Sequence, residues 1–92
     1  MIRSVFLSKF AKKQLAKIPL FISQKLLGWV LEVERIGLEE VRKTPGYHDE
    51  PLYGKLAGLR SIRLSRSYRA YCRVEQNEIE FVMIERIDKH EY

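Results

Sequence analysis

Apolar residues recur with helical spacing in the first half of the chain and with a period of two in the second half. Residues Met1 to Leu7 alternate over a short stretch, which predicts a first strand. Ser8 is a suitable N-cap for a short helix with one buried stripe. This stripe consists of Phe10, Ala11, Leu15 and Ile18. Pro19 then ends this helix or begins the next.

A second, longer helix is predicted over Leu20 to Ile36, where the apolar positions keep a helical period. Its expected buried face consists of Ile22, Leu26, Trp29, Val30 and Val33. Gly37 favours a C-terminal stop. Residues Leu38 to Lys43 are compatible with one further turn before Thr44-Pro45-Gly46 breaks the chain.

The period changes to two after this break. Residues Arg60 to Ser65 and Tyr68 to Val74 each alternate, and a plausible hairpin turn at 65–67 separates them. A second turn at Gln76-Asn77 leads into Ile79 to Ile84, the last predicted strand. The predicted order is strand, helix, helix and a three-stranded meander. This order predicts an α+β fold in which two helices pack on one face of an antiparallel sheet. With 92 residues, we expect a single domain over 1–92.

The alternation assigns side chains to the two faces of the predicted sheet. The small and aliphatic set is expected to pack on the helices: Ile62, Leu64, Ala70, Cys72 and Val74. The opposite set is expected to project from the open face: Arg63, Arg69, Tyr71 and Arg73. A slip of one residue would bury charges, so the assignment is strongly constrained. The sequence therefore predicts an open, basic and partly aromatic sheet face.

Positive charge is concentrated on these strands. The stretch Pro51 to Val74 holds six cations and no carboxylate, and the whole chain has a net charge of +5. Guanidinium groups fixed on a rigid sheet suit phosphate. The cations expected to bind RNA or phosphate are Lys55, Arg60, Arg63, Arg66 and Arg73. Charge alone does not choose among RNA, DNA, a membrane surface and an acidic protein.

Three further residue groups have candidate chemistry. Glu50, in the segment before the basic strands, is a candidate general base, although the simpler interpretation is a solvated loop. Arg69 needs a phosphate, a carboxylate or solvent, and the simpler interpretation pairs it with Glu80 across the ladder. His90 and Tyr92 supply an acid and a ring for base stacking, or belong to a frayed tail.

Several classes of protein are disfavoured by the composition. The single cysteine, Cys72, excludes an internal disulfide and indicates a reducing, cytoplasmic setting. We expect no signal peptide, no membrane span and no small-molecule cofactor. The two histidines and the carboxylates make no recognised metal-ligand spacing. No glycine-rich phosphate loop or nucleophile motif occurs.

The motifs of the C-terminal half, taken in order, resemble those of the RelE/ParE superfamily of toxins, in particular the RelE/YoeB-like mRNA interferases. The matching motifs are His48-Asp49-Glu50-Pro51-Leu52, Gly58-Leu59-Arg60-Ser61-Ile62-Arg63-Leu64, Tyr68-Arg69-Ala70-Tyr71 and the terminal His90-Glu91-Tyr92. YoeB-like chains end in adjacent His and Tyr, whereas Glu91 separates them here. The resemblance covers nearly the whole chain.

This resemblance implies an endoribonuclease that enters the ribosomal A site and cuts mRNA there without a metal, using the 2′-hydroxyl of the substrate as nucleophile. By resemblance, Glu50 takes the proton from that hydroxyl and Arg69 stabilises the phosphorane charge. His90 then protonates the leaving 5′-oxygen, Tyr92 stacks on or orients a nucleotide, and Arg63 holds phosphate.

Two other functions remain open from the sequence. The fold and charge suit a ParE-like toxin that inhibits DNA gyrase equally well, and such a toxin does not need the acid and base residues. A silent homologue that only binds RNA or an antitoxin is the third possibility. In each case the charge and the resemblance predict an acidic partner, the cognate antitoxin, besides the ribosome and mRNA of the first hypothesis.

Overall fold

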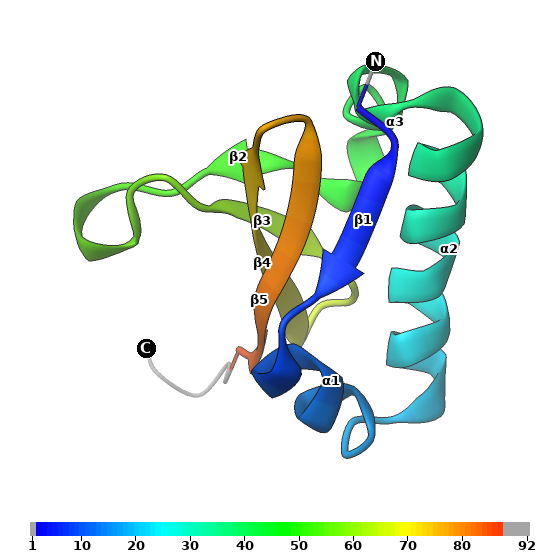
Figure 1. Cartoon of the computed structure of the whole chain (residues 1–92). Coiled ribbons are helices and arrows are strands. Elements are labelled where there is room, and N and C mark those ends of the chain that lie inside the picture. Colours follow the sequence, from blue (N-terminus) through cyan, green and yellow to red (C-terminus); the bar gives the residue numbers. More distant parts are fainter. Residues whose placement is uncertain (1, 88–92) are drawn as a thin grey trace.

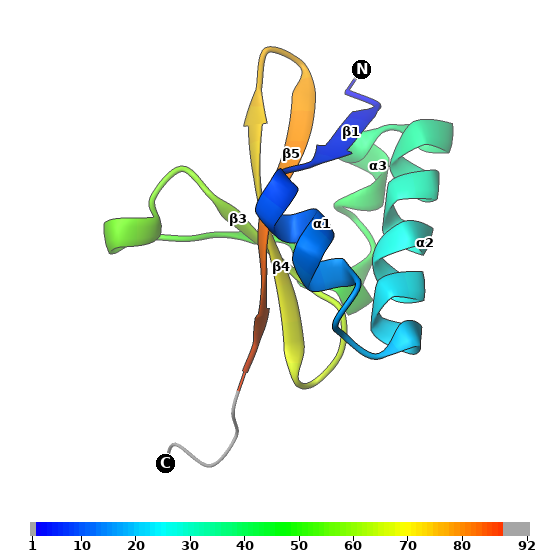
Figure 2. The same cartoon turned by 60° about the horizontal axis from the view of Figure 1, so that its bottom comes forward.

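The computed structural model describes residues 2–87, which form a sheet with helices on one side (Figures 1 and 2). The helices are α1 (Lys9–Leu15), α2 (Leu20–Ile36) and α3 (Leu38–Val41). The strands are β1 (Ser4–Leu7), β2 (Glu50–Pro51), β3 (Arg60–Arg63), β4 (Tyr68–Glu75) and β5 (Glu78–Arg86). Short 3₁₀ turns at Pro45–Tyr47 and Gly54–Leu56 flank β2. The predicted α+β arrangement, with its C-terminal meander, is confirmed.

The five strands form one mixed sheet in the order β1-β5-β4-β3-β2. The strands β2 to β5 pair antiparallel, whereas β1 runs parallel to β5 and adds an edge to the meander. The sheet is therefore mixed and not wholly antiparallel. After β1, the chain passes through the helices and returns to the sheet at β2, on the opposite edge. The two-residue strand β2, which the alternation did not reveal, forms the opposite edge.

Helix α2 covers the sheet along its length and has the bounds that the sequence predicts. It buries Ile22, Leu26, Trp29 and Val33 against the sheet, and the Trp29 ring meets the Phe81 ring edge to face with centroids 5.2 Å apart. Gly37 ends the helix with a φ of 89°, a conformation that favours glycine. No helix in the described part of the chain has the length and apolar character needed to cross a membrane.

Helix α1 closes the part of the β5 edge that β1 leaves open. The Ser8 hydroxyl accepts from the Ala11 amide, as the predicted N-cap requires, and donates to the Val82 carbonyl at 3.1 Å. The Gln14 side chain donates to the Ile84 carbonyl and accepts from the Ile84 amide, both at 2.6 Å. A side-chain amide thus replaces a neighbouring strand at this edge.

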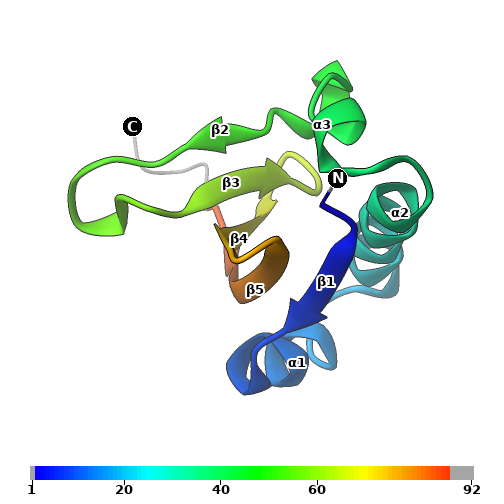
Figure 3. The same cartoon turned by 45° about the horizontal axis from the view of Figure 1, so that its top comes forward.

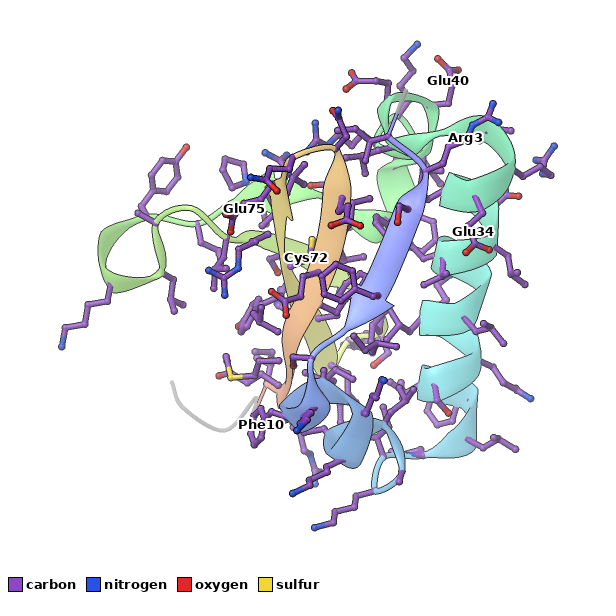
Figure 4. All side chains as sticks on the ribbon, viewed as in Figure 1. Arg3, Phe10, Glu34, Glu40, Cys72 and Glu75 are labelled. Carbon is purple, nitrogen blue, oxygen red and sulfur yellow. The ribbon has the colours of Figure 1, made fainter. Side chains whose placement is uncertain are left out.

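The predicted buried stripe of α1 is wrong at Phe10. Ala11 is buried and Leu15 and Ile18 pack against the core, but 56% of Phe10 is exposed (Figure 4). Phe10 precedes Ala11 directly, and with seven residues the helix presents only a narrow face to the sheet. The helical spacing of Phe10 was compatible with the stripe, and the docking angle of α1 decided otherwise.

Candidate functional site

Strand register places Glu50 on the sheet face that points away from the helices. Glu50 lies opposite Ser61, Ser61 lies opposite Tyr71, and Tyr71 lies opposite Met83. Directly opposed residues share a face of the sheet. The alternate positions beside this row, Ile62 and Ala70, are fully buried under the helices. The row that begins at Glu50 therefore lies on the open face.

A second row on this face contains both arginines that the resemblance assigns to phosphate. Arg63 lies opposite Arg69, and Arg69 lies opposite Glu85. This row is two residues further along each strand, about 7 Å away, and neighbouring strands are about 5 Å apart. The Cα atom of Glu50 is therefore about 8 Å from that of Arg63 and about 12 Å from that of Arg69. Side chains of this length can reach one nucleotide from these positions.

A β-bulge in β5 places the carboxylate of Glu85 on the open face, a position that strict alternation does not predict. Tyr71 pairs with Met83, but the next residue, Cys72, pairs with Phe81, so Val82 is the extra residue. Strict alternation from Ile79 and Phe81 places Glu85 on the helix face. The bulge moves Ile84 to the core and Glu85 to the open face, opposite Arg69. The acidic residue at the end of an otherwise apolar strand was the available signal.

Tyr71 lies on the open face as predicted, but it is not an exposed aromatic surface. Only 6% of the residue is accessible. Burial, together with a hydrogen bond to the Glu85 carboxylate, raises the pKa of Tyr71 to about 12. Beside it, the buried Ser61 hydroxyl has no hydrogen-bond partner among residues 2–87. Tyr71 therefore forms the floor of the site, with Glu50 and the arginines at its rim.

Arg63 and Arg69 keep their charge available. Both are partly exposed, and in the described part of the chain neither side chain makes a hydrogen bond or an ion pair. The simpler interpretation, a pair between Arg69 and Glu80, is wrong because Glu80 lies opposite Arg73, four residues further along β4. The guanidinium groups of Arg63 and Arg69 can therefore bind an external anion without first breaking an ion pair with a carboxylate of the protein.

Arg73, by contrast, is neutralised. Its Nε lies 3.5 Å from Glu80 and 3.6 Å from Glu75, and Glu78 lines the same shallow cavity. The open face is thus not uniformly basic. Its upper end, near the β4–β5 turn, is acidic, and its free cations lie toward the β3–β4 turn. Arg73 is poorly placed to bind phosphate.

Arg60 lies on the other face of the sheet, which removes it from the predicted phosphate surface. It is opposite Cys72, and its Nε lies 2.5 Å from the Asp49 carboxylate. Arg42 approaches the same carboxylate at 3.3 Å, and the Asp49 side chain is only 2% exposed. Charge alone groups Arg60 with the other strand arginines, whereas alternation places Arg60 and Arg63 on opposite faces of the sheet. This Arg42–Asp49–Arg60 cluster anchors the segment that presents Glu50.

The remaining predicted residues lie at the margins. Lys55 belongs to the β2–β3 connection, which projects from the sheet on the side away from the helices (Figures 2 and 3). Arg66 is exposed in the β3–β4 turn. His90 and Tyr92 lie outside the described residues. Within residues 2–87, no three His, Cys, Asp or Glu side chains come together in a way that suits a metal ion.

Comparison with known proteins finds similarity at the level of structure only. No family model matches the sequence, and no curated protein matches it significantly. Among solved structures, YafQ from E. coli is similar with a TM-score of 0.72 at 17% identity, covering 91% of this chain and 92% of YafQ. The RelE–RelB complex from Pyrococcus horikoshii gives 0.70 at 21% identity, with 97% and 99% covered. The YoeB–YefM complex from Staphylococcus aureus gives 0.68 at 18% identity, with 89% and 93% covered.

Proposed function

We propose that this chain, which has the fold of the RelE/ParE toxins, is the toxin of a type II toxin–antitoxin system and cleaves mRNA in the ribosomal A site. The observation that carries the proposal is the shared open face of Glu50, Arg63 and Arg69. In metal-independent phosphodiester cleavage, a carboxylate can act as the general base, and two guanidinium groups with free charge can stabilise the charge that develops on phosphate.

The proposed step uses the 2′-hydroxyl of the RNA as nucleophile. Glu50 takes the proton from this hydroxyl, and the 2′-oxygen forms a bond to the adjacent phosphorus. The bond from that phosphorus to the 5′-oxygen of the next nucleotide breaks, which leaves a 2′,3′-cyclic phosphate. Arg63 and Arg69 bind the non-bridging oxygens, where negative charge increases in the transition state. His90 donates a proton to the leaving 5′-oxygen, and Tyr92 stacks on a nucleotide, as the resemblance implies.

The proposed protein partner is a cognate antitoxin with an acidic segment that lies over the free cations. RelE and YoeB were both solved in complexes, with RelB and YefM respectively. The net charge of +5 favours an acidic partner for this chain as well. Co-expression with the adjacent open reading frame tests this part: a stable complex is expected, and a chain that is harmless and soluble alone contradicts it.

The central experiment compares induced wild type with Arg69→Ala, using Arg73→Ala as the matched control. Both arginines are on β4 and on the same face, but Arg73 is already neutralised by Glu75 and Glu80. Wild type and Arg73→Ala are expected to arrest growth and to create new mRNA 5′ ends within coding regions. Arg69→Ala is expected to abolish both, with an unchanged circular dichroism spectrum. Full toxicity of Arg69→Ala contradicts the mechanism.

A second variant separates proton transfer from phosphate binding. Glu50→Gln keeps the shape of the side chain and removes the base, so cleavage is expected to fall by about 10²–10⁴-fold while RNA binding persists. Growth arrest with DNA damage signalling and no new mRNA ends identifies a gyrase-inhibiting toxin instead. Absence of any arrest by wild type identifies a non-catalytic homologue.

A further inference from the structure

A surface cavity of about 450 Å³ lies at the end of the sheet, on the side of the helices. Its walls are Pro19 and Phe21 at the start of α2, the turn residues 65–67, and Tyr68 and Arg86. Tyr68 and Arg86 are directly opposed on β4 and β5 and share the helix face with Ala70. The cavity is therefore separate from Glu50, Arg63 and Arg69, which lie on the open face.

Among residues 2–87, the walls of this turn cavity hold two cations and no acid. In the described residues, neither the Arg66 nor the Arg86 side chain makes an ion pair or a hydrogen bond. A neighbouring cavity of about 250 Å³ shares Ser65 and Arg66 and adds Lys25 and Arg63, and none of its lining residues in the described part of the chain is acidic. Free positive charge thus continues from Arg63 on the open face, round the β3–β4 turn, to Arg86. The acidic surface around Arg73 lies at the opposite end of β4.

Phe21 gives the turn cavity a flat apolar wall. The residue is 65% exposed, which is costly for a phenyl ring that touches only water. The volume lies within the range of about 300–1,000 Å³ that is typical of small-ligand sites. A ring beside guanidinium groups is the arrangement with which proteins hold unpaired nucleotides, because the base stacks on the ring and the phosphate binds the cations.

We propose that the turn cavity binds one nucleotide of single-stranded RNA, with the base against Phe21 and the phosphates at Arg66 and Arg86. RNA is favoured over an acidic peptide because the free cations run without interruption from the proposed cleavage face into this cavity. The choice of RNA rests on the proposed function. The cavity itself needs neither Glu50 nor Arg69, so it is a second RNA contact that holds the strand outside the cleavage face.

The test measures fluorescence anisotropy of a short, labelled single-stranded RNA with 2′-O-methyl riboses, which lacks the nucleophile and stays intact. Phe21→Ala is expected to weaken binding by about 5-fold or more. Arg86→Gln is expected to reduce the slope of log affinity against log salt by about 0.7, the value for one phosphate contact. Phe10→Ala and Arg35→Gln are matched controls, since both residues are exposed and neither lines the turn cavity, and both variants are expected to bind as wild type does.

Thermal unfolding of each variant accompanies the binding assay, so that a loss of fold is not mistaken for a loss of contact. Unchanged RNA binding by folded Phe21→Ala and Arg86→Gln overturns the proposal. Weaker binding of the antitoxin with unchanged RNA binding also overturns it and identifies a protein site. Ultraviolet cross-linking of wild type to mRNA-programmed ribosomes, followed by sequencing of the attached RNA, distinguishes a messenger nucleotide from an unpaired ribosomal one. If Phe21 cross-links to neither the messenger RNA nor the ribosomal RNA, the proposal is contradicted.

The two proposals fail independently. If wild type cleaves mRNA but Phe21→Ala binds RNA normally, the cleavage function stands and the second contact is wrong. If wild type never cleaves but Phe21→Ala and Arg86→Gln both lose affinity, the RNA contact stands and the cleavage function is wrong.

Discussion

Two adjacent acidic residues, Asp49 and Glu50, have opposite environments. Asp49 is buried between Arg42 and Arg60, whereas Glu50 is exposed at the start of β2. Successive side chains of an extended segment point to opposite sides, so one position decides whether a carboxylate has a structural or a chemical role. Asp49 forms ion pairs with two arginines on the helix face. Glu50 remains available on the open face.

Asp49→Asn is expected to destabilise the protein, because it leaves two partly buried guanidinium groups without their carboxylate. The expected loss in free energy of unfolding is about 1.5–3 kcal/mol. Glu39→Gln is the control, since Glu39 is 73% exposed and approaches Arg42 only at 4.0 Å, and its effect is expected to stay within about 0.5 kcal/mol. Urea unfolding measures both, and equal midpoints for the two variants contradict this account of Asp49.

Tyr71 and Cys72 predict a loss of stability at alkaline pH. Burial raises the pKa of the Cys72 thiol to about 12, and burial with the Glu85 hydrogen bond raises the pKa of Tyr71 to about 12. In the unfolded chain both groups lose their protons at lower pH. Between about pH 9 and pH 12 the folded protein therefore binds more protons, and the free energy of unfolding falls as pH rises.

The measurement is denaturant unfolding over this pH range. Tyr71→Phe is expected to make the decline shallower by up to about 1.4 kcal/mol per pH unit above pH 10, because it removes one of the two titrating groups. Tyr53→Phe is the control, since Tyr53 is 80% exposed. An identical pH dependence for wild type and Tyr71→Phe is the result that this explanation does not permit.

At the scale of elements, α1 acts as a cover for a sheet edge. The strand β1 ends at Leu7, opposite Phe81, and β5 continues to Arg86. Ser8 and Gln14 bond to the backbone of β5 beyond that point. An uncovered edge of this kind invites pairing with other chains. The polar residues of a short helix thus replace the missing length of β1.

Gln14→Ala is expected to cost about 1–3 kcal/mol of stability, because the amide and carbonyl of Ile84 lose their partner at a partly buried position. Hydrogen exchange at the Ile84 amide is expected to become faster, while exchange in α2 stays unchanged. Gln24→Ala, on the exposed side of α2, is the control. Slow exchange at Ile84 in the Gln14→Ala variant shows that another group protects this edge.

At the scale of the whole molecule, the net charge of +5 is unevenly distributed. Glu75, Glu78 and Glu80 gather near the β4–β5 turn and neutralise Arg73. The side chains of Arg63, Arg69, Arg66 and Arg86 have no carboxylate partner within residues 2–87 and lie toward the other end of the sheet. An approaching polyanion is therefore oriented along the strands before it makes close contact.

This polarity predicts different salt dependences for two arginines of the same strand. Arg69→Gln is expected to reduce the slope of log RNA affinity against log salt by about 0.7, the contribution of one phosphate contact to single-stranded RNA. Arg73→Gln is expected to leave the slope nearly unchanged, because its charge is already balanced. Titration of a 2′-O-methyl RNA at several salt concentrations measures both slopes, and a larger effect of Arg73→Gln contradicts the proposed division of the face.

Local patterns in the sequence specify α2, β3 and β4 and most of the burial along them. Helical spacing predicts the bounds of α2, and Gly37 marks its end. Alternation predicts which side chains of β3 and β4 face the helices. These features depend on local periodicity and backbone conformation, which the residues of one segment specify. The opposite faces of Arg60 and Arg63 were also contained in the alternation, since three positions separate them.

Tertiary structure alone decided which charges are free. The register of β3, β4 and β5 brought Glu80 to Arg73 instead of Arg69, and the bulge at Val82 turned Glu85 toward Tyr71. The parallel placement of β1 beside β5 and the cover by α1 likewise joined segments far apart in the chain. Such pairings depend on the relative energies of alternative registers and packings across the whole core, and no single segment of the sequence contains that comparison.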